Sequence, residues 1–353
     1  MSNEQSHPGA PAAAGVPPAP VVPGVVTGLG ALPGEDPREA ARTVFGELGD
    51  PPHVPHLPQL PARGPGADPV GRTAALLVDL AVDLQPAGWR FVDAAGRDLQ
   101  RARSFLRADL DELAEAADGW RGSLTVAVVG PWSLLAAVEL QRGERAVSDH
   151  GARRDVVDSL AQGVADHVAD VRRLVPGARV LVQLEEPSLT AVLEGRLPTQ
   201  SGYGSLRSVH APEVRAGLTT VFDAVRRAGA EPVLRVAAED TPWSLVRETR
   251  PAAVAVDVTR LGSAGWESVA VTVEAGTALW AGVVPVSADP PPLAGLVEAV
   301  TTPWRRIGMP AELLTGIVVT PVDGLAALPP DAVRPVLARL REVGAAVAES
   351  SGD

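Results

Sequence analysis

The chain has 353 residues and a formal net charge of −12, and it contains neither cysteine nor lysine. Without cysteine it forms no disulfide, no thiolate metal site and no thiol nucleophile. Without lysine it forms no Schiff base. The acidic balance argues against nucleic acids and anionic membrane surfaces as partners.

Residues 1–24 differ in composition from the rest of the chain. They read MSNEQSHPGAPAAAGVPPAPVVPG, and their excess of proline and alanine predicts a disordered tail. They lack the basic start and continuous apolar core of a signal peptide. No later stretch approaches the roughly 18 apolar residues of a membrane span. We therefore expect a cytoplasmic protein with one domain over residues 25–347 and a short C-terminal tail over residues 348–353.

Short apolar runs rich in β-branched residues alternate with longer amphipathic stretches. Such near-continuous apolar runs favour parallel strands that are buried on both faces. The predicted strands are Val25–Thr27, Leu124–Val129, Arg179–Leu184, Pro232–Val236, Ala253–Val258, Ala278–Val284 and Gly316–Thr320, with an eighth near Trp89–Val92.

The amphipathic stretches between these runs predict helices. In Arg153–Leu174, for example, apolar side chains recur every three to four residues. Alternating strands and helices indicate βα units, and about eight of them favour an α/β fold of the (β/α)8 TIM-type barrel class in a single domain. The other predicted helices are Asp36–Leu48, Val70–Leu84, Leu99–Ala117, Ala211–Ala228, Leu293–Arg306 and Asp331–Ala346.

Residues Asp50–Asp68 form a long segment rich in proline and glycine after the first predicted helix. Loops of this length inside a compact domain are often functional lids. His53 and His56 lie in it at short spacing, but no third metal ligand accompanies them. We expect both to be solvated loop histidines. Arg63 in the same segment is expected either to bind substrate or to pair with Asp68.

Charged residues follow several of the predicted strands. In a barrel of this class the functional site forms from the loops at the C-terminal ends of the strands. Glu185 and Glu186 follow one apolar run, and Arg235, Asp257 and Asp323 lie at the ends of others. Their positions predict a polar ligand site at this end of the barrel.

The same positions resemble motifs of the C-terminal domain of cobalamin-independent methionine synthases, which share their barrel with uroporphyrinogen decarboxylases. Gln183–Pro187 resembles the Q-[IL]-D-E-P motif of that family. The other similar motifs, in chain order, are Gly30–Pro33 with G-S-F-P, Val129–Pro131 with T-G-P, Gly282–Ser287 with G-V-x-D-x-H-S, and Thr320–Leu325 with N-P-D-C-G-L.

The resemblance implies methyl transfer from 5-methyltetrahydrofolate (or its polyglutamate) to homocysteine in methionine biosynthesis, assisted by zinc. The position of the family's His-x-Cys pair reads Arg235-Val236-Ala237, its glutamate ligand falls near Asp257, and its late cysteine is Asp323. We therefore expect no zinc site of the family type. The resemblance assigns substrate binding to Gly30, Ala31, Glu185, Glu186, Arg235, Asp257, Ser287 and Asp323.

Three functions remain open from the sequence. The first is a methyltransferase of the methionine synthase type. The second is a non-catalytic barrel that has kept the pocket and binds a small molecule such as an amino acid or a folate. The third is a metal-free lyase of the decarboxylase kind, in which Arg63, Arg235 and Asp257 would hold the substrate. The sequence assigns no catalytic residue.

Overall fold

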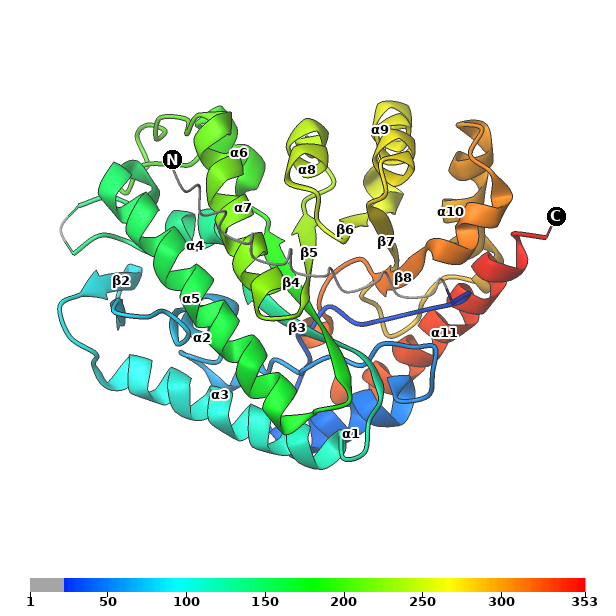
Figure 1. The fold of residues 1–353 in the computed structure, drawn as a ribbon, viewed down its shortest axis with the longest axis horizontal. Coiled ribbons are helices and arrows are strands. Elements are labelled where there is room, and N and C mark those ends of the chain that lie inside the picture. Colours follow the sequence, from blue (N-terminus) through cyan, green and yellow to red (C-terminus); the bar gives the residue numbers. More distant parts are fainter. Residues whose placement is uncertain (1–21, 142, 353) are drawn as a thin grey trace, which may run out of the picture.

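A computed structural model describes residues 22–141 and 143–352, so most of the expected tail, residues 1–24, lies outside the described residues. Within the described residues, six parallel strands form a curled sheet in chain order. They are β3 (Gly122–Val129), β4 (Ala178–Glu186), β5 (Glu231–Val236), β6 (Ala253–Asp257), β7 (Ala278–Val284) and β8 (Val318–Pro321). Helices surround the sheet (Figure 1), which confirms the predicted α/β barrel class.

The helices cover the outer face of the strands. None in the described part of the chain is long and apolar enough to cross a membrane. They are α1 (Pro37–Leu48), α2 (Pro69–Ala74), α3 (Arg97–Ala116), α4 (Pro131–Ala137), α5 (His150–Leu174), α6 (Leu189–Glu194), α7 (Ala211–Arg227), α8 (Trp243–Thr249), α9 (Ser263–Glu274), α10 (Leu293–Arg306) and α11 (Val333–Glu349).

Alternate residues of each strand face opposite sides of the barrel wall. Val233, Ala255 and Trp280 form a small apolar cluster that is separate from the main core. Their sequence neighbours Leu234, Val254 and Leu279 belong instead to the large cluster that includes the helices. The first set therefore lies in the barrel interior, and Trp280 is its largest side chain.

Two short segments close the ring between β8 and β3. Val26 pairs in parallel with Val319 of β8, Thr27 pairs with Val54, and His56 pairs with Thr125 of β3. The Val54 N–H donates to the Val26 carbonyl at 2.9 Å. The seventh and eighth positions of the barrel are thus filled by residues 25–27, as predicted, and by residues 54–56.

The second of these segments corrects the prediction of a long loop over Asp50–Asp68. Proline has no backbone N–H to donate to a neighbouring strand. Pro55 pairs with β3 through its carbonyl instead, which accepts from the Thr125 N–H at 3.0 Å. Leu57 donates to the Thr125 carbonyl at 2.9 Å, and Gln59 donates to the Gly30 carbonyl at 2.9 Å. The segment is therefore part of the barrel wall.

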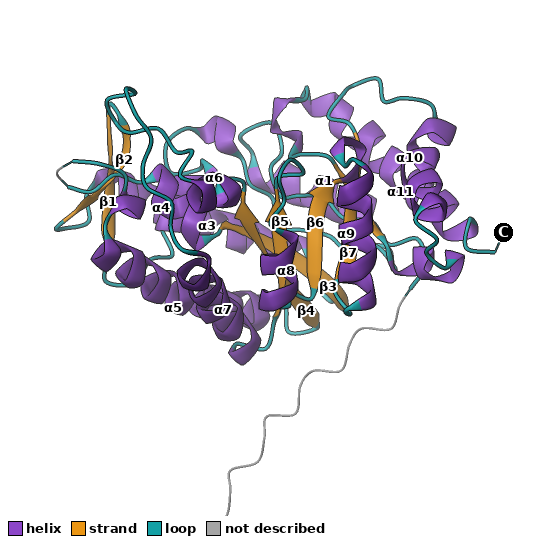
Figure 2. Cartoon of the chain, turned by 90° about the horizontal axis from the view of Figure 1, so that it is seen from above, coloured by secondary structure: helices purple, strands orange, loops and turns teal. Residues whose placement is uncertain are grey.

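A strand forms near Trp89–Val92 as predicted, but it is not the eighth strand of the barrel, and only the start of the predicted helix Val70–Leu84 is helical. Residues 89–92 belong to β2 (Gly88–Val92), which pairs antiparallel with β1 (Ala81–Gln85) in a hairpin apart from the central strands (Figure 2). The helical pattern failed because its apolar residues serve two elements. Ala74 is buried at the end of α2, and Val82 is buried within β1.

Candidate functional site

The C-terminal ends of β5 to β8 surround a pocket of about 340 Å³. Three of the residues predicted from the sequence, Arg235, Asp257 and Asp323, lie in its wall. Others in the wall are Leu29, Arg260 and Thr320. Two arginines and two aspartates thus bring four charges to a cavity of modest size, which suits a small polar ligand.

Arg235 is the central cation of this pocket. Its Nη2 donates to Asp323 Oδ1 at 2.6 Å, and its Nη1 lies 3.7 Å from Glu185 Oε2. The Asp323 side chain is 71% exposed, whereas that of Glu185 is 16% exposed. Arg235 therefore joins a carboxylate of the barrel interior to a solvent-facing carboxylate at the pocket mouth.

Glu185 lies deeper and depends on its neighbours for its charge. Burial raises the pKa of its carboxyl group. The Arg235 guanidinium opposes this rise, as does the Gln183 amide, whose Nε2 donates to Glu185 Oε1 at 2.9 Å. The nearby Asp323 adds to the rise. Arg235 thus favours the ionised form of the Glu185 carboxyl group, whereas burial favours its neutral form.

Asp257 and the Arg260–Glu239 ion pair complete the charged wall. Asp257 Oδ1 accepts from the Thr259 N–H at 3.0 Å and from the Thr259 hydroxyl at 2.6 Å. Within residues 22–141 and 143–352, Asp257 has no ion-pair partner. Its second oxygen remains available to a cationic group on a ligand.

Glu186 is adjacent to Glu185 in sequence but faces the opposite side of the wall. Its carboxylate is fully buried at the start of α4, where it accepts from the Trp132 N–H at 2.9 Å. It also accepts from the Ser133 N–H and hydroxyl, both at 2.8 Å. Burial raises its pKa to about 7. Glu186 therefore binds the start of α4 and lies outside the pocket wall.

The remaining predicted residues contact the backbone near the pocket. Gly30 has φ +99°, and its carbonyl accepts from Gln59. The Ala31 carbonyl accepts from the Leu325 N–H at 2.8 Å. The Ser287 hydroxyl exchanges hydrogen bonds of 3.2 Å with the backbone of Asp289 in the loop after β7. All three lie outside the pocket wall.

Two expectations for the Asp50–Asp68 segment are corrected. His56 is 1% exposed, so it is a barrel residue and not a solvated loop histidine. Arg63 is also buried, and it pairs with Asp109 of α3 at 2.7 Å instead of Asp68. Asp109 also pairs with Arg72 of α2. Arg63 therefore lies with the outer helices and does not contribute to the pocket.

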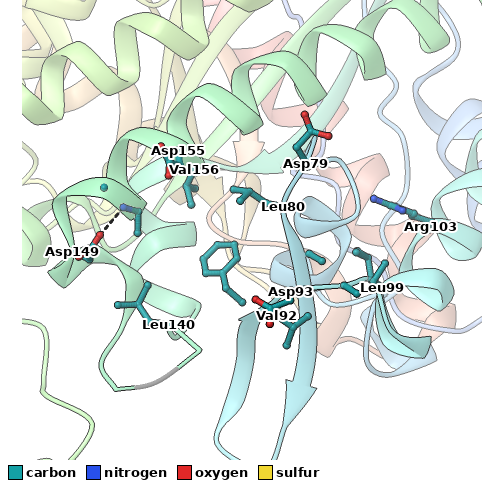
Figure 3. A pocket seen from close by; sticks show the side chains of 16 residues that line it. Asp79, Leu80, Val92, Asp93, Leu99, Arg103, Leu140, Asp149, Asp155 and Val156 are labelled. Carbon is teal, nitrogen blue, oxygen red and sulfur yellow. Dashed lines mark hydrogen bonds between the residues drawn. The ribbon is translucent and has the colours of Figure 1, made fainter.

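A second pocket, of about 630 Å³, lies between the β1–β2 hairpin, α3 and α5 (Figure 3). It is larger, and its wall includes Leu80, Leu140 and Val156 with Asp79 and Asp155. None of the predicted site residues lines it. We favour the smaller pocket as the functional site, because it lies at the strand ends and opposite charges meet in it.

The donor atoms of the pocket determine whether it could hold a metal ion. Asp257 and Asp323 stand where the resemblance places zinc ligands, but the Arg235 guanidinium is bonded to Asp323 beside them. In the described part of the chain, no group of three or more His, Asp or Glu side chains is arranged to hold a metal ion. The residues present do not fit a zinc site of the family type.

The substrate-binding residues assigned from the sequence omit Gln183 and Arg260, although Gln183 belongs to the motif Gln183–Pro187 and Arg260 follows the strand end at Asp257. Gln183 lies two residues before Glu185 on β4, and this period of two places both side chains on the same face of the strand. Its bond to Glu185 could therefore have been expected. Arg260 lies in a short 3-10 turn directly after β6 and therefore close to the strand end at Asp257.

The chain was compared with known proteins. No protein-family model matches the sequence, and neither does any curated protein. A B12-independent methionine synthase from Shewanella sp. W3-18-1, solved with selenomethionine, is similar over 92% of this chain and 97% of its own, with 8% identity and a TM-score of 0.59. A xylose isomerase-like TIM barrel protein from Mycobacterium smegmatis is similar over 94% and 97%, with 14% identity and a TM-score of 0.43. At 8% identity the likeness to the methionine synthase shows a shared fold alone.

Proposed function

We propose that the chain is a methionine synthase-like barrel that binds a small zwitterion, such as an amino acid, at the ends of β4 to β8. The observation that carries this proposal is the position of Arg235 between Glu185 and Asp323 in the pocket. A ligand carboxylate would pair with Arg235 in place of the exposed Asp323, since a planar guanidinium suits carboxylate recognition. A ligand ammonium would pair with Glu185 or Asp257.

The second candidate is the methyl transfer from 5-methyltetrahydrofolate to homocysteine that the resemblance implies. The fold similarity to a B12-independent methionine synthase favours it. It would require a thiolate, and a free thiol has a pKa of about 8.5. The donor set around Arg235 does not suit zinc, because the guanidinium is bonded to Asp323. A folate-like ligand remains compatible with this candidate.

The decisive experiment is calorimetric titration of the full chain with methionine and homocysteine, and with two truncated analogues. One analogue lacks the ammonium group, and the other lacks the carboxylate. We expect binding of the intact amino acids and at least about tenfold weaker binding of each analogue, because each loses a charged partner. Equal binding of either analogue, or none of the intact amino acids, would contradict the proposal.

Arg235→Gln and Arg260→Gln form a matched pair for this titration, because both arginines lie in the same wall. Arg235→Gln should remove most of the affinity, whereas Arg260→Gln should retain it. Metal content of the untagged protein and turnover with 5-methyltetrahydrofolate and homocysteine separate the two candidates. Stoichiometric zinc with turnover would favour the methyltransferase.

A further inference from the structure

Three polar side chains inside the barrel carry buried atoms without partners. These four atoms are the two ring nitrogens of His56, Oγ1 of Thr125 and Oε1 of Gln183. None of them has a hydrogen-bond partner among the described residues. The three residues are 1%, 1% and 0% exposed. Buried polar groups in folded proteins are nearly always paired with protein or ordered water, so four orphan atoms in one region need an explanation.

The strand register places the three side chains on the same inner face. Thr125 of β3 is paired with His56 on one side and with Leu181 of β4 on the other. Leu181 packs against the interior cluster around Trp280. Gln183 follows Leu181 by two residues and so faces the same side of the wall. Paired residues of parallel strands share a face, so all three side chains point inward.

His56 and Gln183 also contact neighbouring residues of the same segment. A Cβ atom added to Gly28 would lie 2.3 Å from His56 Cε1, so the imidazole lies directly against this glycine. Gln183 Nε2 donates to the Leu29 carbonyl at 3.4 Å. The imidazole and the amide thus contact two consecutive residues, Gly28 and Leu29. Leu29 also lines the pocket, which places this group beneath it.

The orphan atoms offer both donors and acceptors but no charge. Burial lowers the pKa of His56 to about 4, so at neutral pH its ring has one donor and one acceptor nitrogen. The Thr125 hydroxyl both donates and accepts. Gln183 Oε1 is an amide oxygen and only accepts, while its Nε2 already donates to Glu185 and Leu29. A water molecule has two donors and two acceptors and matches this set, whereas an ion would find no opposite charge in it.

We propose that the barrel interior beneath the pocket is a binding site for ordered water, which bridges His56, Thr125 and Gln183. The water donates to Gln183 Oε1 and accepts from the Thr125 hydroxyl or the His56 N–H. It thereby gives the amide oxygen of Gln183 a donor, consistent with the amide nitrogen being turned toward Glu185. The barrel interior is thus divided between an apolar half around Trp280 and a hydrated half around His56.

The first test is the sign of a stability change. In Thr125→Val a methyl group replaces the hydroxyl at nearly constant shape. If water bridges the hydroxyl, the variant loses a hydrogen bond and unfolds at lower urea concentration. If the interior is dry, it sheds an unsatisfied polar group and becomes as stable or more stable, which would overturn the proposal. Thr249→Val is the control, because this buried hydroxyl already donates to Leu245 at 2.9 Å.

The second test does not depend on a variant that folds. A crystal structure of the full chain, at a resolution that shows ordered water, should place a density peak about 2.7–3.2 Å from at least two of the three side chains. The amide of Gln183 should direct its oxygen to that peak. An interior without such a peak would refute the assignment.

Discussion

Arg63 and Arg72 share a single carboxylate, that of Asp109. Arg63 donates to one oxygen at 2.7 Å and Arg72 binds the other, and all three side chains are at most 8% exposed. The group carries one negative charge for two positive ones. Burial and the neighbouring Arg63 both lower the pKa of Arg72. Asp109 therefore holds two buried cations of different elements, η1 (Pro61–Arg63) and α2, against α3.

Asp109→Asn should be strongly destabilising, because it leaves two buried guanidinium groups without a counter-charge. Breaking a buried ion pair by removing one partner costs about 3–5 kcal/mol. Urea unfolding of the variant measures this cost. Glu248→Gln is the surface control, since its pair with Arg215 is about half exposed and should contribute little. Equal effects of the two substitutions would contradict the account of Asp109.

Glu186 should make the stability of the protein depend on pH. Its pKa is raised from 4.5 to about 7, so the folded chain binds this proton more tightly than the unfolded chain. Its contribution is therefore fully present below pH 4.5 and is lost as the pH rises to about 7. At roughly 1.4 kcal/mol per pKa unit, the loss amounts to about 3 kcal/mol.

Glu186→Gln checks this by urea unfolding between pH 4.5 and 8. At pH 4.5 the variant should be less stable than the wild type, because one acceptor oxygen facing the Ser133 and Trp132 N–H groups is replaced by a donor. Its profile should nevertheless lack the decline that Glu186 adds to the wild-type profile. Parallel pH profiles for the two proteins would show that Glu186 does not titrate in this range.

Arg235→Gln should raise the pKa of Glu185 further. Burial already raises it, and the Arg235 guanidinium is the first of the influences that oppose the rise. Carbon-13 NMR of the Glu185 carboxyl group, followed through a pH titration, measures the change directly. Arg260→Gln lies in the same pocket wall but pairs with Glu239, so it should leave the titration unchanged. The same shift in both variants would point to a general field effect.

The sequence predicted the six strands of the central sheet well, because their apolar runs are buried on both faces. It missed the strand at residues 54–56, because the prolines of this segment are typical of a loop. The residues between the prolines nevertheless supply the N–H groups that bond to the neighbouring strands. The sequence also grouped Glu185 with Glu186, although strand alternation sends one into the barrel and the other to α4. The partners of Arg63 were beyond reach, since Asp109 lies 46 residues away.

Glycines of this chain differ in how they respond to a methyl group. At Gly28 the added Cβ would lie 2.3 Å from the buried His56 ring, whereas at Gly295 it would meet nothing within 4 Å. Gly28→Ala should therefore destabilise the barrel by about 1–3 kcal/mol through overpacking. Gly295→Ala should stabilise α10 by about 0.5 kcal/mol, because alanine restricts the unfolded chain and favours the helix.

The midpoints of urea unfolding at one pH compare the two variants directly. Opposite signs are expected, because the two sites differ in space and not in the chemistry of the substitution. The backbone of His56 is held in the barrel wall by its pairing with Thr125, so the ring can yield to a new methyl group only by changing its side-chain torsions. Gly28→Ala with wild-type stability would mean that the ring has room to shift, and that the interior around His56 is looser than the contacts with Gly28 indicate.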